Sequence, residues 1–288
     1  SYLGKPLVFC GTGGVMPETV NGKPSWEKET KPGALAVMLG SRIGKDGIHG
    51  ATFSSLALDE SSPVSAVQIG DPITQKKLSD AIVKEARDLG LYHSITDNGA
   101  GGLSCSVAEM ARECGGFEVD LDLVPLKYPG LSPWQIWVSE SQERMTLSVP
   151  REKLDDFRDL MKRRGVEATV IGTFTSSGRG IVRFHNEVVF DLDMNFLHDG
   201  LPQKHLSTKK PAIHLPEIQV PEPEDLTALA GDMLARLNIA SFDFISTQYD
   251  HEVQAGSVIK PLQGKGKVNG NASVIRPLLT SRRGVVLS

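Results

Sequence analysis

The sequence predicts an α/β or α+β fold in which helices pack on a mixed sheet. The run at residues 34–39 is apolar throughout, as expected for a strand buried on both faces. Two strand–turn–helix units follow it, with their turns at residues 70–72 and 97–102. Two later apolar runs, residues 181–184 and 188–192, are joined by a short polar link and indicate an antiparallel hairpin. Because helices are mixed with antiparallel pairs, a purely parallel doubly wound sheet is not expected.

Composition and charge narrow the class of protein. The chain has 288 residues, of which 40% are hydrophobic and 23% charged, a composition typical of a globular protein of roughly two domains. A formal net charge of -4 and short basic runs argue against a nucleic-acid or anionic-membrane surface. No apolar run approaches the ~20 residues that span a bilayer, and the start of the chain lacks a signal-peptide pattern. We therefore expect a cytoplasmic location.

The three cysteines, Cys10, Cys105 and Cys114, are an odd number and include no C-x-x-C pair. They predict neither a disulfide framework nor a zinc site. Packing is the favoured interpretation of Cys105 and Cys114.

Composition divides the chain into four parts. Residues 1–32 are interpreted as the end of a preceding domain, with a brief strand at residues 7–10. Residues 33–200 hold most of the helix and strand patterns and predict one compact domain. Five prolines between residues 201 and 224 indicate a semi-rigid linker. Residues 225–288 are interpreted as the start of another domain, and because the first residue is Ser1 we expect a piece of a longer polypeptide.

The first strand–turn–helix unit places a polar side chain at the end of a strand. Residues 64–69 predict that strand, and Gln68 lies near its C-terminal end, where α/β proteins usually bind ligands; the alternative is an exposed amide. Asp71 suits the N-cap and Pro72 the first helical position. The buried face of the helix is expected to carry Leu78, Ile82, Ala86 and Leu89, with Gly90 as its end.

The second unit places a carboxylate beside three glycines ahead of a helix. Asp97 is followed by Gly99, Gly101 and Gly102, and the helix is expected to bury Leu103, Val107, Met110 and Cys114. Glycines permit close backbone approach, and the unpaired N–H groups of a first helical turn attract anions. We therefore expect a phosphate, or a metal-bridged phosphate held through Asp97. The alternative is a tight turn without a ligand, because the spacing matches neither common phosphate-binding glycine motif.

The glycine-rich loop at residues 40–55 leaves two interpretations open. Arg42 and Lys45 could face phosphate, or they could be solvated charges on a surface loop. His49 could act as a general acid or base, although a lone histidine is more often structural.

Between the two halves of the predicted domain, polar residues interrupt apolar runs. Asp120 and Asp122 alternate with apolar residues over an expected strand at 119–123, and they suggest either a metal site or the wet face of a sheet. Residues 139–144 separate apolar stretches at 134–138 and 145–149 and are interpreted, on composition, as a hairpin loop. Pro150 then opens a helix that buries Leu154, Phe157, Leu160 and Met161 and ends at Gly165.

Four motifs, taken together and in order, resemble one family. They are DGIHGATFSS at residues 46–55, VQIGDP at 67–72, DNGAGGL at 97–103 and SESQERM at 139–145. The set closely resembles the small, multi-subunit form of phosphoribosylformylglycinamidine synthase. The resemblance continues through residues 191–200 and 249–254 and so covers essentially the whole chain.

The resemblance implies an ATP-dependent ligase of the fourth step of purine biosynthesis. ATP, formylglycinamide ribonucleotide and ammonia give the amidine, ADP and phosphate through an iminophosphate. A separate glutaminase subunit would supply the ammonia from glutamine, together with a small third subunit. The implied fold is an aminoimidazole ribonucleotide synthetase-like C-terminal domain, the first of two such repeats, flanked by partial domains.

The same resemblance implies roles for five residues. Gln68, Glu140, Ser141 and Gln142 look like substrate contacts, which overturns the hairpin-loop interpretation, and Asp97 looks like a ligand of Mg²⁺. Mg²⁺ and ATP are the expected cofactor and co-substrate. No catalytic residue is assigned within this chain, because the family's catalytic histidine and principal ATP contacts are expected upstream of Ser1. The isolated chain is therefore expected to be inactive.

Two alternatives remain beside this interpretation. One is another ATP-dependent member of the aminoimidazole ribonucleotide synthetase superfamily, such as selenophosphate synthetase or thiamine-monophosphate kinase, which lack this combination of motifs. The other is a non-catalytic fragment that docks partner subunits. Ammonia-dependent turnover with and without the partners separates a catalytic from a docking role.

Overall fold

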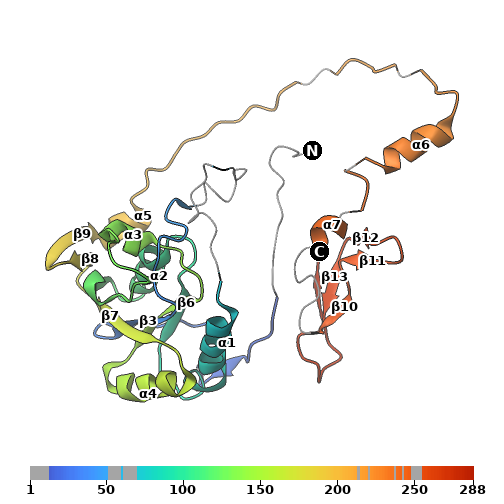
Figure 1. Ribbon diagram of the computed structural model, residues 1–288. Helices are drawn as coiled ribbons and strands as arrows, with labels where there is room; N and C mark the ends of the chain where they lie inside the picture. Colours follow the sequence, from blue (N-terminus) through green and yellow to red (C-terminus); the bar gives the residue numbers. More distant parts are fainter. Residues whose placement is uncertain are drawn as a thin grey trace. The chain divides into compact units, whose positions relative to one another are not determined.

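The computed structural model describes residues 13–50, 60, 70–212, 215–219, 221–236, 238–241, 243–247 and 255–288 (Figure 1). Its contacts divide the chain into two compact units, of which the larger is Glu18–His205. The other consists of Leu206–Ser288 and the residues before Glu18. The predicted strands at residues 7–10 and 64–69, and with them Gln68, lie outside the described residues.

The larger unit is built on a mixed sheet of seven strands. Their order across the sheet is β4-β6-β3-β7-β5-β8-β9, and among these described strands only β5 and β8 pair in parallel. The strands are β3 (Leu35–Gly40), β4 (Ser94–Asp97), β5 (Gly116–Asp120), β6 (Arg144–Val149), β7 (Ala168–Thr175), β8 (Arg179–Phe184) and β9 (Glu187–Asp193). A mixed sheet packed with helices, as the sequence predicts, is confirmed.

Strand β3 is apolar throughout because both of its faces are covered. Leu35, Val37 and Leu39 face one core with the helices α1 (Pro72–Ala81) and α4 (Leu154–Arg164). Ala36 and Met38 face a second core with α2 (Gly102–Ala111), α3 (Pro133–Val138) and α5 (Met194–Asp199). Figure 1 shows the strands lying between these two groups of helices. Burial of alternate side chains on opposite faces follows from the two-residue period of a strand.

The predicted start of α1 and the predicted end of α4 are confirmed, whereas α2 ends earlier than predicted. Asp71 caps α1, its Oδ1 accepting from the N–H of Ile73 at 3.0 Å, and Pro72 is the first helical residue. Leu103, Val107 and Met110 are buried on α2, although Cys114 lies in the turn that follows this helix. A short 3₁₀ turn, Arg151–Lys153, precedes α4, which buries Phe157, Leu160 and Met161 and ends at Gly165.

The prediction that Leu89 is buried is wrong. A π-helical turn, Ile82–Ala86, follows α1, and the N–H of Arg87 donates to the carbonyl of Ile82. The extra residue in that turn shifts the helical phase, so that Leu89 is exposed. The helix ends as a Schellman motif, in which Gly90 has a positive φ and the N–H of Leu91 donates to Ala86. Leu91 is therefore the buried residue.

Two expected strands differ from the prediction: the one at residues 119–123 ends at Asp120, and the one at residues 134–138 does not form. Asp120 ends β5, because its side chain accepts from the N–H of Asp122 at 2.9 Å and closes a 3₁₀ turn over Leu121–Leu123. Residues 134–138 belong to helix α3 instead, with Pro133 at its first turn and Gln135 accepting from the Ser132 N–H at 3.0 Å. That capping-box pattern outweighs the β propensity of the apolar run.

The hairpin between β8 and β9 is confirmed. His185 and Asn186 both have positive φ, +52° and +64°, as the tightest hairpin turns require. The Nδ1 atom of His185 lies 2.9 Å from Asp122 Oδ1, and the backbone N–H of His185 donates to the same carboxylate.

The second unit contains short elements. Helix α6 (Leu226–Leu234) is capped by Asp225. Two small sheets follow, one of β10 (Ser257–Ile259), β13 (Ser273–Ile275) and β14 (Val285–Leu287), the other of β11 (Leu262–Gln263) and β12 (Val268–Asn269). The remaining elements are the strands β1 (Thr19–Val20) and β2 (Lys23–Pro24) of the larger unit and the helix α7 (Asp243–Ser246). Among the described residues, no helix has the length and apolarity needed to cross a membrane.

Candidate functional site

The Asp97 turn leaves the sheet at the end of edge strand β4. Asp97 pairs with Met145 of β6 and is exposed, and its Oδ1 accepts from the N–H of Gly99 at 2.9 Å. Gly101 and Gly102 then take φ values of +78° and +54° and lead directly into α2. These left-handed conformations favour glycine, so the spacing of the glycines sets the path of the turn.

Asn98 anchors this turn to the fold. Its N–H donates to the carbonyl of Arg144 at 3.2 Å, and its buried Oδ1 accepts from the hydroxyls of Ser106, at 2.6 Å, and Thr146, at 3.0 Å. The turn is thereby tied to both α2 and β6. Asp97 is held in place while its carboxylate stays at the surface.

A second turn, residues 139–143, connects α3 to β6 and touches the first. Glu140 accepts from the N–H of Gly101 at 3.1 Å, and its own N–H donates to the carbonyl of Asp46 at 2.8 Å. A β-carbon on Gly102 would lie 1.9 Å from the carbonyl oxygen of Ser139, so only glycine permits this approach. The structure therefore brings Asp97 and Glu140 to adjoining turns.

The start of α1 reaches the same place. A β-carbon on Gly70 would lie 2.8 Å from Glu143 Oε1, so the residue that precedes the N-cap Asp71 lies against the second turn. Gln68 is two residues earlier in the chain, outside the described residues. The expectation that Gln68 contacts the substrate therefore stays a prediction.

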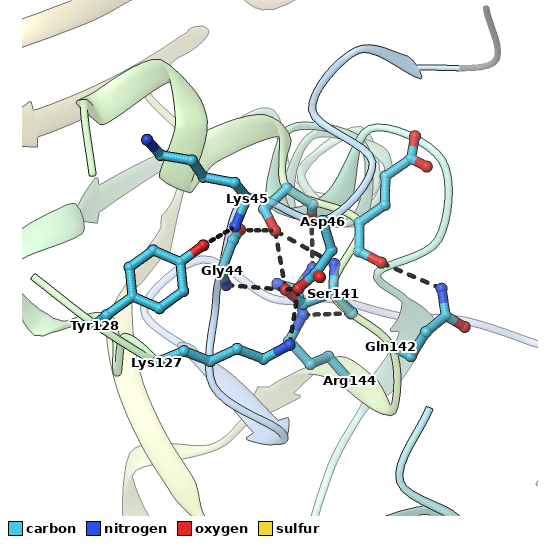
Figure 2. A network of polar contacts seen from close by, with 10 residues as sticks. Gly44, Lys45, Asp46, Lys127, Tyr128, Ser141, Gln142 and Arg144 are labelled. Atoms are coloured by element: carbon cyan, nitrogen blue, oxygen red, sulfur yellow. Dashed lines mark hydrogen bonds and ion pairs between the residues drawn. The ribbon is translucent and has the colours of Figure 1, made fainter. Parts of the chain in front are cut away.

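The side chains of Ser141 and Gln142 both form hydrogen bonds to groups of the protein. Ser141 is 1% exposed, and its hydroxyl donates to Asp46 Oδ2 and accepts from the N–H of Gly44 at 2.9 Å (Figure 2). Gln142 Nε2 donates to the carbonyl of Glu140 at 3.2 Å. The hydroxyl of Ser141 is thus directed into the protein, whereas the side chain of Gln142 stabilises the turn by its hydrogen bond to Glu140.

Asp46 joins the second turn to the loop after β3. Its Oδ2 lies 2.8 Å from Lys127 Nζ as well as accepting from Ser141 (Figure 2). Burial opposes ionisation of this carboxyl, but the hydrogen bonds from Lys127 and Ser141 outweigh burial and lower its pKa below the usual value. Asp46 is therefore a charged, partly buried link at ordinary pH.

Arg144 lies beneath the second turn with only 3% of its surface exposed. Its Nε donates to the carbonyl of Ser141 at 2.7 Å and its Nη2 to the carbonyl of Ser139. Burial lowers the pKa of Arg144 to about 10, and the charge of Asp46 partly offsets this effect. The guanidinium remains protonated near neutral pH and holds the turn by hydrogen bonds to two of its backbone carbonyls.

The loop at residues 40–50 contributes less directly than its composition suggests. Arg42 forms an exposed ion pair with Glu167 at 3.1 Å. The N–H of Lys45 donates to the Tyr128 hydroxyl at 2.8 Å, while its side chain extends away from the polar network (Figure 2). His49 is exposed. Asp46 joins this loop to the site by its side chain, and Gly44 joins it by its main chain.

A metal site depends on which side chains lie close enough together to hold an ion. Within the described part of the chain, no group of three or more histidine, cysteine, aspartate or glutamate side chains is placed to hold an ion. Asp122 is engaged by His185, which favours a structural interpretation of the Asp120 and Asp122 pair. Asp97 supplies a single exposed carboxylate, which fits Mg²⁺ held jointly by one or two carboxylates and substrate phosphates.

Sequence reasoning missed Asp46, Asn98, Lys127 and Arg144 as site residues. The last of these is the arginine of the SESQER motif, and a charged residue beginning an apolar strand is a signal that could have marked it. Lys127 carried no such signal, because its partner Asp46 lies 81 residues away. Cys105 and Cys114 are partly buried, and burial raises the pKa of both thiols.

Comparison with known proteins places the larger unit in a family. Residues 31–185 match the family described as AIR synthase related protein, C-terminal domain. The PurL subunit of phosphoribosylformylglycinamidine synthase from Thermoplasma acidophilum is 34% identical over the whole chain, which covers 38% of that protein. The corresponding subunit from Methanopyrus kandleri is 39% identical over 91% of this chain and 36% of its own length.

Solved structures agree with the sequence relatives. Thermotoga maritima PurL complexed with FGAR is 29% identical with a TM-score of 0.62, over 86% of this chain and 38% of that one. The PurLQS structure from the same organism is 26% identical with a TM-score of 0.61, over 86% of this chain and 36% of that one. The chain thus spans somewhat over a third of the length of its PurL relatives. It belongs to the AIR synthase related family, as a relative of the PurL subunit of phosphoribosylformylglycinamidine synthase.

Proposed function

We propose that this chain forms part of the formylglycinamide ribonucleotide site of a PurL-type synthase, an ATP-dependent ligase of purine biosynthesis. The observation that carries the proposal is the contact between the Asp97 turn and the Glu140 turn, through the 3.1 Å bond from Gly101 to Glu140. The FGAR complex of the Thermotoga maritima relative supports the ribonucleotide, and complexes of that protein with ATP and ADP support the nucleotide.

The proposed reaction makes an amidine from an amide. The γ-phosphate of ATP passes to the amide oxygen, giving ADP and an iminophosphate; ammonia then attacks the carbon and phosphate leaves. Phosphoryl transfer depends chiefly on positioning and on charge stabilisation. The task of the residues in this chain is accordingly to hold the ribonucleotide in place.

Each polar group at the two turns suits a different part of the ligand. When it is ionised, Glu140 can accept hydrogen bonds but cannot donate them, so it suits hydroxyl or amide N–H groups of the ribonucleotide rather than its phosphate. Gln68 and Gln142 can both donate and accept. Ser141 contributes to the turn through its backbone, because its hydroxyl is engaged by Asp46 and Gly44.

Asp97 is the residue of this chain that would hold Mg²⁺. Its carboxylate lies at the entrance to α2, where the first N–H groups of the helix also favour a phosphate. When bound, Mg²⁺ would neutralise phosphate charge. Asp97 itself orients the glycine turn through its bond to Gly99.

The proposal extends to partners and location. Ammonia would come from a glutaminase subunit acting with a small third subunit, an arrangement supported by the likeness to the PurLQS structure. Such a complex would work in the cytoplasm. A role confined to docking these subunits is the alternative, and ligand binding distinguishes the two.

The test is calorimetric titration of the chain with formylglycinamide ribonucleotide, in parallel for the unchanged chain and two variants. Glu140→Gln keeps an acceptor for Gly101 and removes the charge, and Glu152→Gln makes the same change outside the site. We expect Glu140→Gln to weaken binding about tenfold, the loss of one charge-assisted hydrogen bond, and Glu152→Gln to leave it unchanged. Equal affinity in all three proteins, or no binding at all, rejects the proposed site.

A further inference from the structure

We infer that Asp46, Ser141 and Arg144 form a positioning clamp that sets the turn at residues 140–142 in place for its ligand. The clamp deepens the proposed function and rests on it for the identity of the ligand. Its structural claim, that three side chains outside the ligand contact fix this turn, stands on contacts within the chain and is testable without a ligand.

The first part of the clamp is the hydroxyl of Ser141. It is 1% exposed, donates to Asp46 Oδ2, accepts from the N–H of Gly44 and lies 3.1 Å from Ser139 Oγ. A hydroxyl has one proton to donate and two lone pairs, and these contacts occupy it from the protein side. Ser141 is therefore assigned a positioning role, although the SESQER motif places it between two residues expected to touch the ligand.

The second part is the guanidinium of Arg144. It donates to the carbonyls of Ser139 and Ser141, so the carbonyl groups of the two residues on either side of Glu140 are held by one rigid fork (Figure 2). A lysine ammonium is a single point charge on a flexible stem and cannot reproduce that fork. The choice of arginine at this buried position is explained by the two carbonyls it must reach together.

The third part is Asp46, which makes the buried charge tolerable. Its carboxylate sits between Ser141 and Lys127 and exerts a favourable charge interaction on Arg144. Its backbone carbonyl also accepts from the N–H of Glu140 at 2.8 Å. Asp46 thus holds the turn by its side chain and by its main chain.

The clamp reaches the Asp97 turn through Glu140. The carboxylate of Glu140 accepts from Gly101, and the carbonyl of Ser139 lies against Gly102. A turn that is free to shift would lose both contacts. The amide protons of Gly101 and Glu140 therefore report on the clamp, although neither donates to a side chain of Asp46, Ser141 or Arg144.

The experiment measures hydrogen exchange of those two amides in the whole chain, with the amides of α4 as an internal reference. The variants are Ser141→Ala, Arg144→Lys and Asp46→Asn, and the matched control is Arg151→Lys. Arg151 also donates to a backbone carbonyl, that of Gly33, but does so at an exposed position outside the site. We expect exchange of Gly101 and Glu140 to be about tenfold faster in each clamp variant, the effect of losing one hydrogen bond, with α4 and the control unchanged.

Four results are decisive. Unchanged exchange of Gly101 and Glu140 in Ser141→Ala and Asp46→Asn overturns the clamp. Equal acceleration in α4 also overturns it, because the side chains would then stabilise the whole domain rather than the turn. If exchange of the two amides becomes faster and the dissociation constant for formylglycinamide ribonucleotide rises in parallel, the clamp serves the ligand. Faster exchange without a change in affinity, or without any binding by the unchanged chain, rejects the ligand assignment but supports the clamp.

Discussion

Replacing Gly102 with alanine tests the contact on which the site is built. Gly102 has φ of +54°, and a β-carbon there would lie 1.9 Å from the Ser139 carbonyl oxygen. Gly178 is the matched control, since its φ is +74° but nothing lies within 4 Å of the added carbon. Both substitutions incur the strain of a left-handed alanine, and only Gly102→Ala also forces two turns apart.

The magnitudes follow from these two terms. A left-handed conformation costs an alanine about 1–2 kcal/mol, which is the whole effect expected for Gly178→Ala. Forcing the Ser139 turn away adds about 1–3 kcal/mol, as for other overpacked positions. Gly102→Ala should therefore lower the free energy of unfolding by about 2–5 kcal/mol, the larger value applying if the Glu140 contact to Gly101 is lost as well.

The assay is urea unfolding of both variants, followed by the signal of the larger unit and combined with ribonucleotide titration. We expect Gly102→Ala to be the less stable variant and to bind the ribonucleotide more weakly, while Gly178→Ala binds as the unchanged chain does. Equal losses of stability in the two variants, with equal affinities, would refute the argument that the two turns are locked together by the absence of a side chain at Gly102.

Three further predictions concern single side chains. Asp46→Asn should be less stable than the unchanged chain at neutral pH. The difference should persist above the usual carboxyl pKa of 3.8 and shrink below it, because the lowered pKa of Asp46 gives stability that is lost on protonation. Urea unfolding from pH 7 down to pH 3 measures this difference, and a difference independent of pH would contradict the prediction. Asn98→Ala should lower the free energy of unfolding by about 1–3 kcal/mol, because the hydroxyls of Ser106 and Thr146 lose their shared acceptor; a loss below the error of the urea assay would show that the two hydroxyls satisfy each other. Burial and the hydrogen bond to Glu109 raise the pKa of the Cys105 thiol to about 11. This thiol should therefore be alkylated at pH 8 roughly a hundredfold more slowly than in the unfolded chain. Site-resolved mass spectrometry measures the alkylation rate, and Glu109→Gln should raise it.

Elements set by local chemistry were predictable from the sequence. Asp71 and Pro72 begin α1, Gly165 ends α4, and the apolar run of β3 indicates a strand buried on both faces. In each case the signal lies within a few residues of the structure that it determines. The glycines of the Asp97 turn belong to this class, because a positive φ is a local requirement.

Other features depend on competition between local and distant effects. Residues 134–138 have β propensity, but the Ser132 and Gln135 capping box and Pro133 start a helix. Leu89 fits the helical period until the π-helical turn moves it to the surface. The pattern of apolar residues alone does not report such a change of phase.

The polar network of the site could not be deduced from spacing. Asp46 meets Lys127 across 81 residues and Ser141 across 95. Motif resemblance indicated Glu140 and Asp97 as site residues, and the structure adds the contact between their turns. The roles of Gln68, Glu140, Ser141, Gln142 and Asp97 toward the ligand stay predictions until binding is measured.

The central claim is that Asp97 and the Glu140 turn serve one ribonucleotide and Mg²⁺ site, and calorimetry of Asp97→Asn tests it most directly. Asparagine retains the oxygen that accepts from Gly99 and loses only the charge, whereas Asp88→Asn is an exposed control beside Arg87. We expect the unchanged chain and Asp88→Asn to bind formylglycinamide ribonucleotide more tightly when Mg²⁺ is added, and Asp97→Asn to lose that gain. A gain from Mg²⁺ of the same size in Asp97→Asn would contradict the account.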